Sequence, residues 1–189
     1  MIDKTKLVEI RWHGRGGQGA VTSAELLARA AIDEGKYAQA FPSFGPERRG
    51  APVLAFDRIN EKEHIRVRTE ILEPDVIVVL DPGLISIVDV TSGLKENGVI
   101  VVNTKKSPEE ISKEFGNHWT VAAVDATKIA KEVLGVNIVN TTMLGALLKA
   151  TGVVKIESLA EPLKDRFGRL AERNADAMKR AFDETEVKE

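Results

Sequence analysis

A turn rich in glycine is the part of this sequence best suited to binding a ligand. The run His13-Gly14-Arg15-Gly16-Gly17-Gln18-Gly19 contains the spacing G-x-G-x-x-G and lies between a predicted strand and a predicted helix. Glycine permits positive φ and close approach of the main chain, and the N–H groups at a helix start favour a negative charge. A tight turn that binds nothing is the alternative interpretation, and the residues alone favour neither. If the turn binds, we expect a phosphate or carboxylate site formed by Gly14, Arg15, Gly16, Gly17, Gln18 and Gly19.

A nicotinamide dinucleotide fits this turn poorly. Folds that bind NAD usually carry Asp or Glu roughly twenty residues further on, where it holds the ribose hydroxyls. The corresponding stretch here, Tyr37-Ala38-Gln39-Ala40-Phe41, contains no acidic residue. The first strand is also unlike the buried strand of such folds, because one of its faces is polar (Glu9, Arg11 and His13). A stand-alone NAD(P)-binding protein therefore remains only an alternative.

A second cluster of polar residues lies in a stretch interrupted by prolines and glycines, which predicts a loop from Phe41 to Gly50. Adjacent arginines in such a loop can bind a phosphate or a carboxylate. We therefore add Ser43, Arg48 and Arg49 to the candidate anion-binding residues. An interface loop held by ion pairs is the alternative.

The sequence does not assemble a catalytic centre, because no nucleophile, base and orienting group occur together. The chain has no cysteine, which excludes disulfides, a thiol nucleophile and an iron–sulfur cluster held by this chain alone. Its three histidines (His13, His64 and His118) lack the paired spacing of a helical metal site. We expect no catalytic residue and no metal in this chain.

Composition limits the partners and the compartment. With 43% hydrophobic and 30% charged residues the chain matches folded soluble proteins, and its net charge of −2 gives no reason to expect nucleic acid. Neither a membrane-spanning run nor a signal-peptide pattern is present, so we expect a cytoplasmic protein without a membrane partner. Few glutamines, abundant charge and no cysteine favour a heat-adapted source.

Alternating strands and helices must position the glycine turn. The apolar runs Val76–Leu80 and Val99–Val102 are typical of central parallel strands covered on both faces. We predict a single Rossmann-like α/β domain over residues 1–189, with a mostly parallel sheet and helices on both faces. The expected strands are 8–13, 37–41, 76–80, 99–102 and 120–124, and the expected helices are 20–34, one starting after Ser107, 140–150 and 169–182.

Four local features complete this prediction. Pro52–Ile59 and His64–Arg68 are expected to pair as a β-hairpin across the polar residues between them. Asp81 and Asn140 are interpreted as helix N-caps. The charged tail from Asp183 to Glu189 is expected to be frayed.

Two blocks of the sequence resemble a known family. The segments Ile10–Gly19 (IRWHGRGGQG) and Phe41–Pro52 (FPSFGPERRGAP) are similar to the gamma subunits of 2-oxoacid:ferredoxin oxidoreductases, most of all to the pyruvate:ferredoxin oxidoreductase (pyruvate synthase) type. The stretch Asn140–Gly145 (NTTMLG) fits the same family, and the resemblance extends over nearly the whole chain.

The resemblance implies an anaerobic, multi-subunit enzyme that converts pyruvate, CoA and oxidised ferredoxin into acetyl-CoA, carbon dioxide and reduced ferredoxin. Alpha, beta and delta subunits would hold the thiamine diphosphate, magnesium and iron–sulfur clusters, and this chain would have no activity alone. Its implied role is to pack on the catalytic subunits and to help bind CoA. The alternatives are a gamma subunit of a branched-chain 2-oxoacid or indolepyruvate enzyme, or a purely structural subunit.

Overall fold

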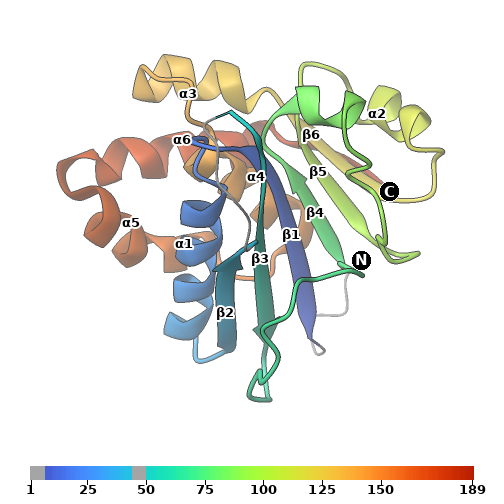
Figure 1. Ribbon diagram of the computed structural model, residues 1–189. Helices are drawn as coiled ribbons and strands as arrows, with labels where there is room; N and C mark the ends of the chain where they lie inside the picture. The colour runs from blue at the N-terminus through green and yellow to red at the C-terminus, as the bar shows by residue number, and fades with distance from the viewer. Residues whose placement is uncertain (1–6, 44–49) are drawn as a thin grey trace.

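The protein is built around one seven-stranded sheet whose strands lie in the order β2-β3-β1-β4-β5-β6-β7 (Figure 1). The structure is a computed structural model and describes residues 7–43 and 50–189. The strands are β1 (Val8–Arg15), β2 (Tyr37–Pro42), β3 (Pro52–Asn60), β4 (Val76–Val79), β5 (Val99–Asn103), β6 (Thr120–Val124) and β7 (Glu186–Lys188).

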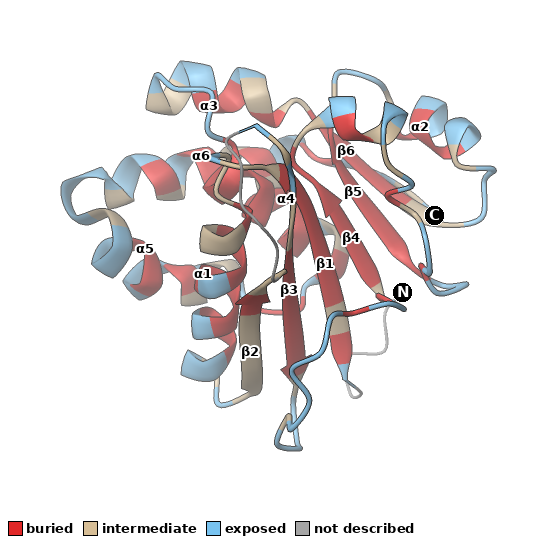
Figure 2. Cartoon of the chain, in the orientation of Figure 1, coloured by how far each residue is buried: buried red, intermediate tan, exposed pale blue. Residues whose placement is uncertain are grey.

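Most strands of this sheet run in one direction. β1, β4, β5 and β6 pair in parallel, while β3 is antiparallel to both β1 and β2. β2 therefore runs the same way as β1, and only β3 and β7 run against the rest. The central strands β4 and β5 are buried along their whole length, as their apolar sequences require (Figure 2). The predicted α/β class with a mostly parallel sheet is confirmed.

Helices cover both faces of the sheet. The main core lies beneath α1, α3, α4, α5 and α6 and includes Trp12, Leu27 and Met143. A smaller core lies on the opposite face beneath α2 and the short turn η1, and includes Leu84, Ile100 and Ile111. The helices are α1 (Ala20–Asp33), α2 (Pro108–Glu114), α3 (Ala126–Leu134), α4 (Asn140–Thr151), α5 (Ala160–Phe167) and α6 (Ala171–Glu184), and the 3-10 turns are η1 (Pro82–Ser86), η2 (Ile156–Leu159) and η3 (Gly168–Leu170).

The predicted pairing of β3 with residues 64–68 is wrong. Residues 64–68 do not form a strand, because β1 and β2 occupy the two edges of β3. The segment is held by side chains instead: Gln39 Nε2 donates to the Ile65 carbonyl (2.7 Å) and an Arg58 guanidinium nitrogen donates to the Val67 carbonyl (3.1 Å). The hairpin of this fold is formed by β2 and β3.

The end of the chain is ordered, contrary to the expected frayed tail. β7 adds to the edge of β6 as an antiparallel strand, and Lys188 Nζ donates to Ser112 Oγ (2.9 Å). An edge strand offers unpaired main-chain groups, so even a charged tail gains hydrogen bonds by pairing with it.

Ser107 and Glu110 form the capping box expected at the start of α2, with bonds of 3.3 and 2.9 Å.

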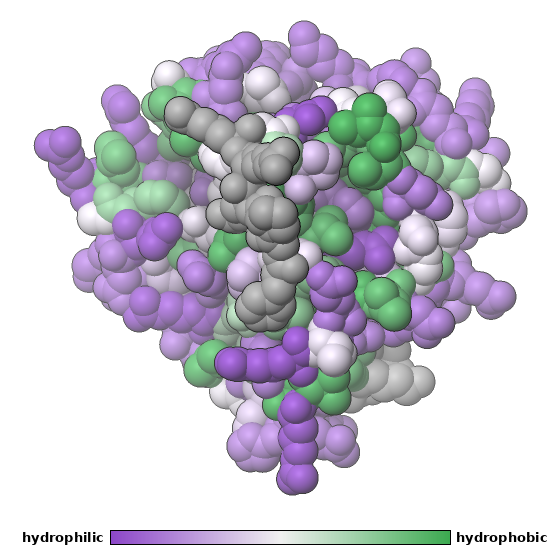
Figure 3. Space-filling model, in the orientation of Figure 1, coloured by the Kyte–Doolittle hydropathy of each residue, from purple (hydrophilic) through white to green (hydrophobic). Residues whose placement is uncertain are grey.

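The described surface on the side drawn in Figure 1 is mainly hydrophilic, with separate apolar patches (Figure 3). Within the described residues, none of the helices has the length and apolar character needed to cross a membrane.

Candidate functional site

The glycine turn connects the end of β1 to the start of α1, as its spacing predicts. Gly17 and Gly19 have φ of 95° and 82°, a region that residues with a side chain rarely adopt. Gly19 is the N-cap residue of α1 and gives the helix no side-chain cap. A Cβ atom at Gly19 would lie 2.6 Å from Asn140 Nδ2, so glycine is also needed for the close approach of α4. The local sequence therefore creates an uncapped helix start.

Part of the turn is occupied by its own hydrogen bonds. The Arg15 amide donates to Gln18 Oε1 (2.7 Å), the Gln18 amide to the Arg15 carbonyl (2.9 Å) and the Gly16 amide to the Ala51 carbonyl (3.0 Å). The amides of Gly17, Gly19 and residues 20–22 have no acceptor among residues 7–43 and 50–189, whereas the Ser23 amide already donates to the Gly19 carbonyl (2.9 Å). These are the main-chain donors that can face an anion.

A single carboxylate holds the turn in shape. Asp81 Oδ2 accepts from Arg15 Nε (3.0 Å) and Gln18 Nε2 (2.9 Å), while its Oδ1 accepts from the Gly83 amide (2.8 Å). Asp81 is thus an N-cap as predicted, and the element that it caps is η1. The same carboxylate also holds the glycine turn against the carboxyl end of β4. The side chains of Arg15 and Gln18 have structural partners, which leaves the backbone of the turn as its ligand-facing part.

Asp81→Asn is expected to loosen the turn. Its amide group would face the donors of Arg15 and Gln18, and the fold should lose about 1–2 kcal/mol, since the Arg15 and Asp81 side chains are 31% and 20% exposed and partly screened. Amide exchange at Arg15 and Gln18 should accelerate about tenfold. Asp165→Asn breaks an exposed pair with Arg29 and should change stability by less than about 0.5 kcal/mol. Equal effects of the two variants on exchange at the turn would contradict this role for Asp81.

A cavity of about 430 Å³ opens at the uncapped start of α1. Its lining includes potential donors: Gly17 and Gly19 of the turn, Asn140 of α4, and the exposed Arg166 and Arg173. Its lining also includes apolar side chains, namely Leu134, Val136, Ile138, Phe167 and Leu170. The cavity therefore combines a place for negative charge with a place for an apolar group.

Asn140 does not have the predicted role of N-cap. Val139 occupies the cap position of α4, and Asn140 begins the helix with its Oδ1 accepting from the Thr141 amide (2.8 Å). The Asn140 side chain is directed to the glycine turn, where its Nδ2 has no acceptor among the described residues. Contact with the distant turn, which no local pattern encodes, determines this orientation.

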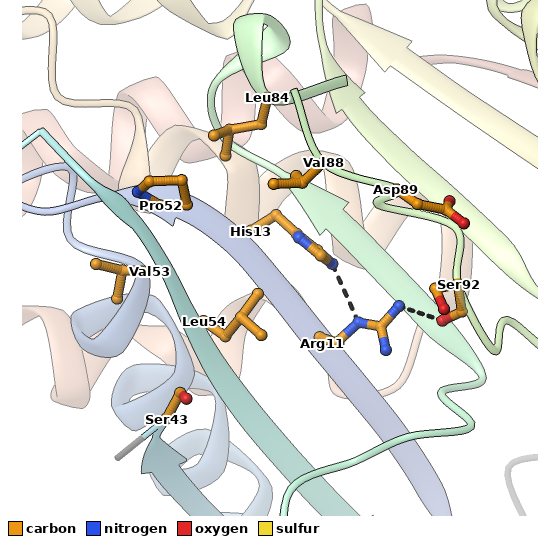
Figure 4. A pocket seen from close by; sticks show the side chains of 10 residues that line it. All are labelled: Arg11, His13, Ser43, Pro52, Val53, Leu54, Leu84, Val88, Asp89 and Ser92. Carbon is orange, nitrogen blue, oxygen red and sulfur yellow. Dashed lines mark hydrogen bonds between the residues drawn. The ribbon is translucent and has the colours of Figure 1, made fainter. Parts of the chain in front are cut away.

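Of the other predicted anion-binding residues, the structure describes Ser43, which lies away from the glycine turn. Ser43 lines a separate cavity of about 490 Å³ on the opposite face of the sheet, and its Oγ donates to Glu70 Oε1 (2.6 Å) (Figure 4). The structure thus separates Ser43 from Gly17 and Gly19. Arg48 and Arg49 lie outside the described residues. Gly50, which follows them, donates its amide to the Gly16 carbonyl (3.3 Å), so the chain returns to the glycine turn at that point.

The polar face of β1 is buried in this second cavity, with Arg11 and His13 only 7% and 5% exposed. Arg11 Nε donates to His13 Nε2 (3.1 Å), and a terminal Arg11 nitrogen donates to the Ser92 carbonyl (2.5 Å) (Figure 4). Burial, and next the charge of Arg11, lower the pKa of His13 to about 3, so the imidazole is neutral at physiological pH. The polar face that the sequence shows on β1 is thus buried at these two positions, and the Val90 and Ser92 carbonyls accept from Arg11.

Neither cavity brings together a nucleophile, a base and an orienting group from the described residues. Residues 7–43 and 50–189 also contain no group of three or more His, Cys, Asp or Glu side chains placed to hold a metal ion. The donors and apolar side chains that line the cavity at the start of α1 would suit an anion that carries an apolar group.

Comparisons with known proteins identify a family that spans nearly the whole chain. Residues 9–184 match the family described as pyruvate ferredoxin/flavodoxin oxidoreductase. The pyruvate/ketoisovalerate oxidoreductases common subunit gamma of Pyrococcus abyssi is 59% identical over 96% of this chain and 98% of that protein. The pyruvate synthase subunit PorC of Methanothermobacter thermautotrophicus is 53% identical over 95% and 97% of the two chains.

A solved structure is also similar to this chain. The pyruvate oxidoreductase subunit PORC of Thermotoga maritima superposes with a TM-score of 0.86 at 40% identity, covering 97% of this chain and 99% of that one. This chain belongs to the pyruvate ferredoxin/flavodoxin oxidoreductase family, as one of its gamma subunits.

Proposed function

We propose that this chain packs on the catalytic subunits of a pyruvate:ferredoxin oxidoreductase and helps them to bind coenzyme A at the glycine turn. The observation that carries the CoA role is the cavity at the start of α1, where free main-chain amides, the Asn140 amide and two arginines converge. CoA carries several phosphate charges that such donors recognise.

Alpha, beta and delta subunits are the proposed partners, with ferredoxin as the electron acceptor of the complex. They would hold the thiamine diphosphate, magnesium and iron–sulfur clusters, in keeping with the absence of cysteine from this chain. This subunit would supply binding surface and no reacting group. We expect it to have no oxidoreductase activity when purified alone.

Pyruvate is the proposed 2-oxoacid, since all three similar proteins described above carry pyruvate in their names. A gamma subunit shared with a branched-chain 2-oxoacid enzyme is the second candidate, favoured by the name of the Pyrococcus abyssi relative. Purifying this chain from native cells and testing its complexes against pyruvate and ketoisovalerate separates the two. A single complex that is active on pyruvate supports a subunit of a pyruvate enzyme alone. Two complexes, one active on pyruvate and one on ketoisovalerate, support a shared gamma subunit.

The CoA role predicts a loss of affinity in the assembled enzyme when Arg49 is changed to Ala. Removing one charge-assisted contact should weaken CoA binding about tenfold and make it less sensitive to salt. Arg66→Ala is the control, because Arg66 is exposed and lines neither cavity. Titration of CoA at two salt concentrations measures both effects. If the Arg49→Ala enzyme binds CoA with the same affinity and salt dependence as the Arg66→Ala enzyme, Arg49 does not belong to the CoA site.

A further inference from the structure

We infer that the second cavity, above Arg11 and His13 of β1, is a docking surface where a catalytic subunit of the same enzyme inserts an apolar side chain beside a hydrogen-bond acceptor. The inference rests on the proposed function, because it assigns to this face the packing on the catalytic subunits that we propose there.

The helices cover this side of the sheet unevenly. α2 and η1 pack on β4, β5 and β6. Figure 1 shows no helix in front of β1, β3 and β2, so the segment 64–71 is what accompanies this half of the sheet among the described residues. The cavity of about 490 Å³ opens between β1, β3 and residues 84–92 (Figure 4). A single subunit thus leaves half of one sheet face open to a partner.

His13 places an unpaired donor at this cavity. Its Nε2 accepts from Arg11 Nε (3.1 Å) and its imidazole is neutral, so the ring proton is on Nδ1. That N–H group has no acceptor among residues 7–43 and 50–189, although His13 is only 5% exposed. Buried donors almost always have an acceptor, because an unsatisfied one is costly. An oxygen of a partner chain would satisfy it.

Arg11 adds a positive charge beneath the same cavity. Its guanidinium donates to the His13 ring and to the carbonyls of Ile71, Val90 and Ser92. These acceptors are all neutral, and no carboxylate in the described part of the chain lies within ion-pair distance of Arg11. A buried cation favours an acceptor over a donor as the group that enters the cavity.

The rim and lining of the cavity are apolar. Leu72 and Ile87 are 74% and 57% exposed, the highest values for large apolar side chains in the described residues. Ile87 directly precedes Val88 of the lining, and the Leu72 carbonyl lies against Gly93, which follows Ser92 of the lining. Exposed apolar groups gathered around a hollow are typical of an interface in which the partner supplies a buried anchor.

The shape and charge of this surface determine the kind of occupant. A second copy would bring two hollows together across a two-fold axis, each with a buried Arg11, so neither copy would fill or neutralise the other. Ferredoxin would meet the enzyme only in passing, and electron-transfer encounters use small interfaces, whereas apolar rims are typical of permanent ones. The occupant is therefore a permanently bound, different chain with a protruding apolar side chain next to a carbonyl or carboxylate oxygen.

The test is assembly of the double variant Leu72→Glu/Ile87→Glu with the alpha, beta and delta subunits. Both residues are exposed, so the chain itself should fold, and circular dichroism of the isolated chain checks this. We expect its affinity for the other subunits, measured by sedimentation over a dilution series, to fall at least about tenfold, because charges would be buried at the interface. Ile32→Glu is the matched control, since Ile32 is 54% exposed on α1 and lines neither cavity.

Hydrogen exchange tests the same surface without a substitution. The amides of residues 84–92 should exchange at least about tenfold more slowly in the assembled enzyme than in the chain alone. Those of residues 28–35, around Ile32, should exchange at the same rate in both. Equal protection of the two segments would overturn the inference.

The remaining outcomes separate this inference from the proposed function. If the unmodified chain assembles and the double variant assembles equally well, the docking surface is wrong and the proposed function stands. If the unmodified chain does not assemble with the other subunits, the proposed function fails. A chain that forms dimers alone through Leu72 and Ile87, or retains a small molecule in this cavity in native mass spectrometry of the assembled enzyme, would show that the occupant is wrong.

Discussion

Gly145→Ala is expected to destabilise the protein by about 3 kcal/mol or more, because it inserts a methyl group between two packed helices. Gly145 lies in the buried helix α4, and its added Cβ would be 1.9 Å from the Met178 carbonyl oxygen of α6 and 3.0 Å from the Phe182 amide nitrogen. These are main-chain atoms, which cannot move aside as the end of a side chain can. The helices must separate, and both of them cover the main core.

Denaturant unfolding measures this effect, with Gly135→Ala as the control. A Cβ at Gly135 would meet nothing within 4 Å, and its φ of 74° makes the change cost about 1–2 kcal/mol from backbone strain alone. If Gly145→Ala is no more destabilising than Gly135→Ala, the helices can adjust and the close contact is not a constraint.

Asp57→Asn is expected to stabilise the protein at alkaline pH relative to the unmodified chain. Asp57 is completely buried on β3, where Trp12 Nε1 donates to its Oδ2 (2.7 Å) and its Oδ1 has no partner among the described residues. Burial raises the pKa of Asp57 well above its ordinary value, and the bond from Trp12 opposes that rise. The folded protein therefore holds this proton more tightly than the unfolded chain does.

The sign of the pH dependence follows from this difference. Asp57 reduces the free energy of unfolding as pH rises from about 3.9, its pKa in the unfolded chain, up to the higher pKa of the folded state. The asparagine side chain of the variant has no proton to lose and can still accept from Trp12. The free energy of unfolding of the variant should therefore rise, relative to that of the unmodified protein, by about 1.4 kcal/mol for each pH unit within that window.

Thermal or denaturant unfolding between pH 4 and pH 9 checks the prediction. Asp183→Asn is the control, because Asp183 is exposed near the end of α6 and should leave the pH profile unchanged. Parallel pH profiles for Asp57→Asn and the unmodified protein would show that Asp57 is not held protonated.

Much of the fold is contained in local sequence patterns. The apolar runs of β4 and β5 place them at the centre of the sheet, and the small residues of α1, ended by Gly35, predict its length closely. The glycine spacing between β1 and α1 predicts an uncapped helix start, and the Ser107–Glu110 pair predicts the start of α2. Each of these depends on residues close together in the chain, so sequence alone determines them.

Tertiary structure decided which distant segments meet. β3 lies between β1 and β2 rather than beside residues 64–68, because two strands already satisfy its edges. β7 is ordered only because β6 presents an edge. Arg11 and His13 alternate with apolar residues as a solvent-facing row would, yet both are buried, and the distant segment 90–92 accepts hydrogen bonds from Arg11.

The candidate site divides in the same way. The glycine turn is visible in the sequence, whereas Asn140, Arg166 and Arg173 join it only when α4 and α5 pack against α1 and α6 packs against α4. Ser43 is nearer to the turn in sequence than these three residues are, but it lies on the other face of the sheet. Side-chain types and their local spacing indicate what a segment can bind. Contacts between remote segments depend instead on the packing of the whole core. That packing determined which residues line the cavity.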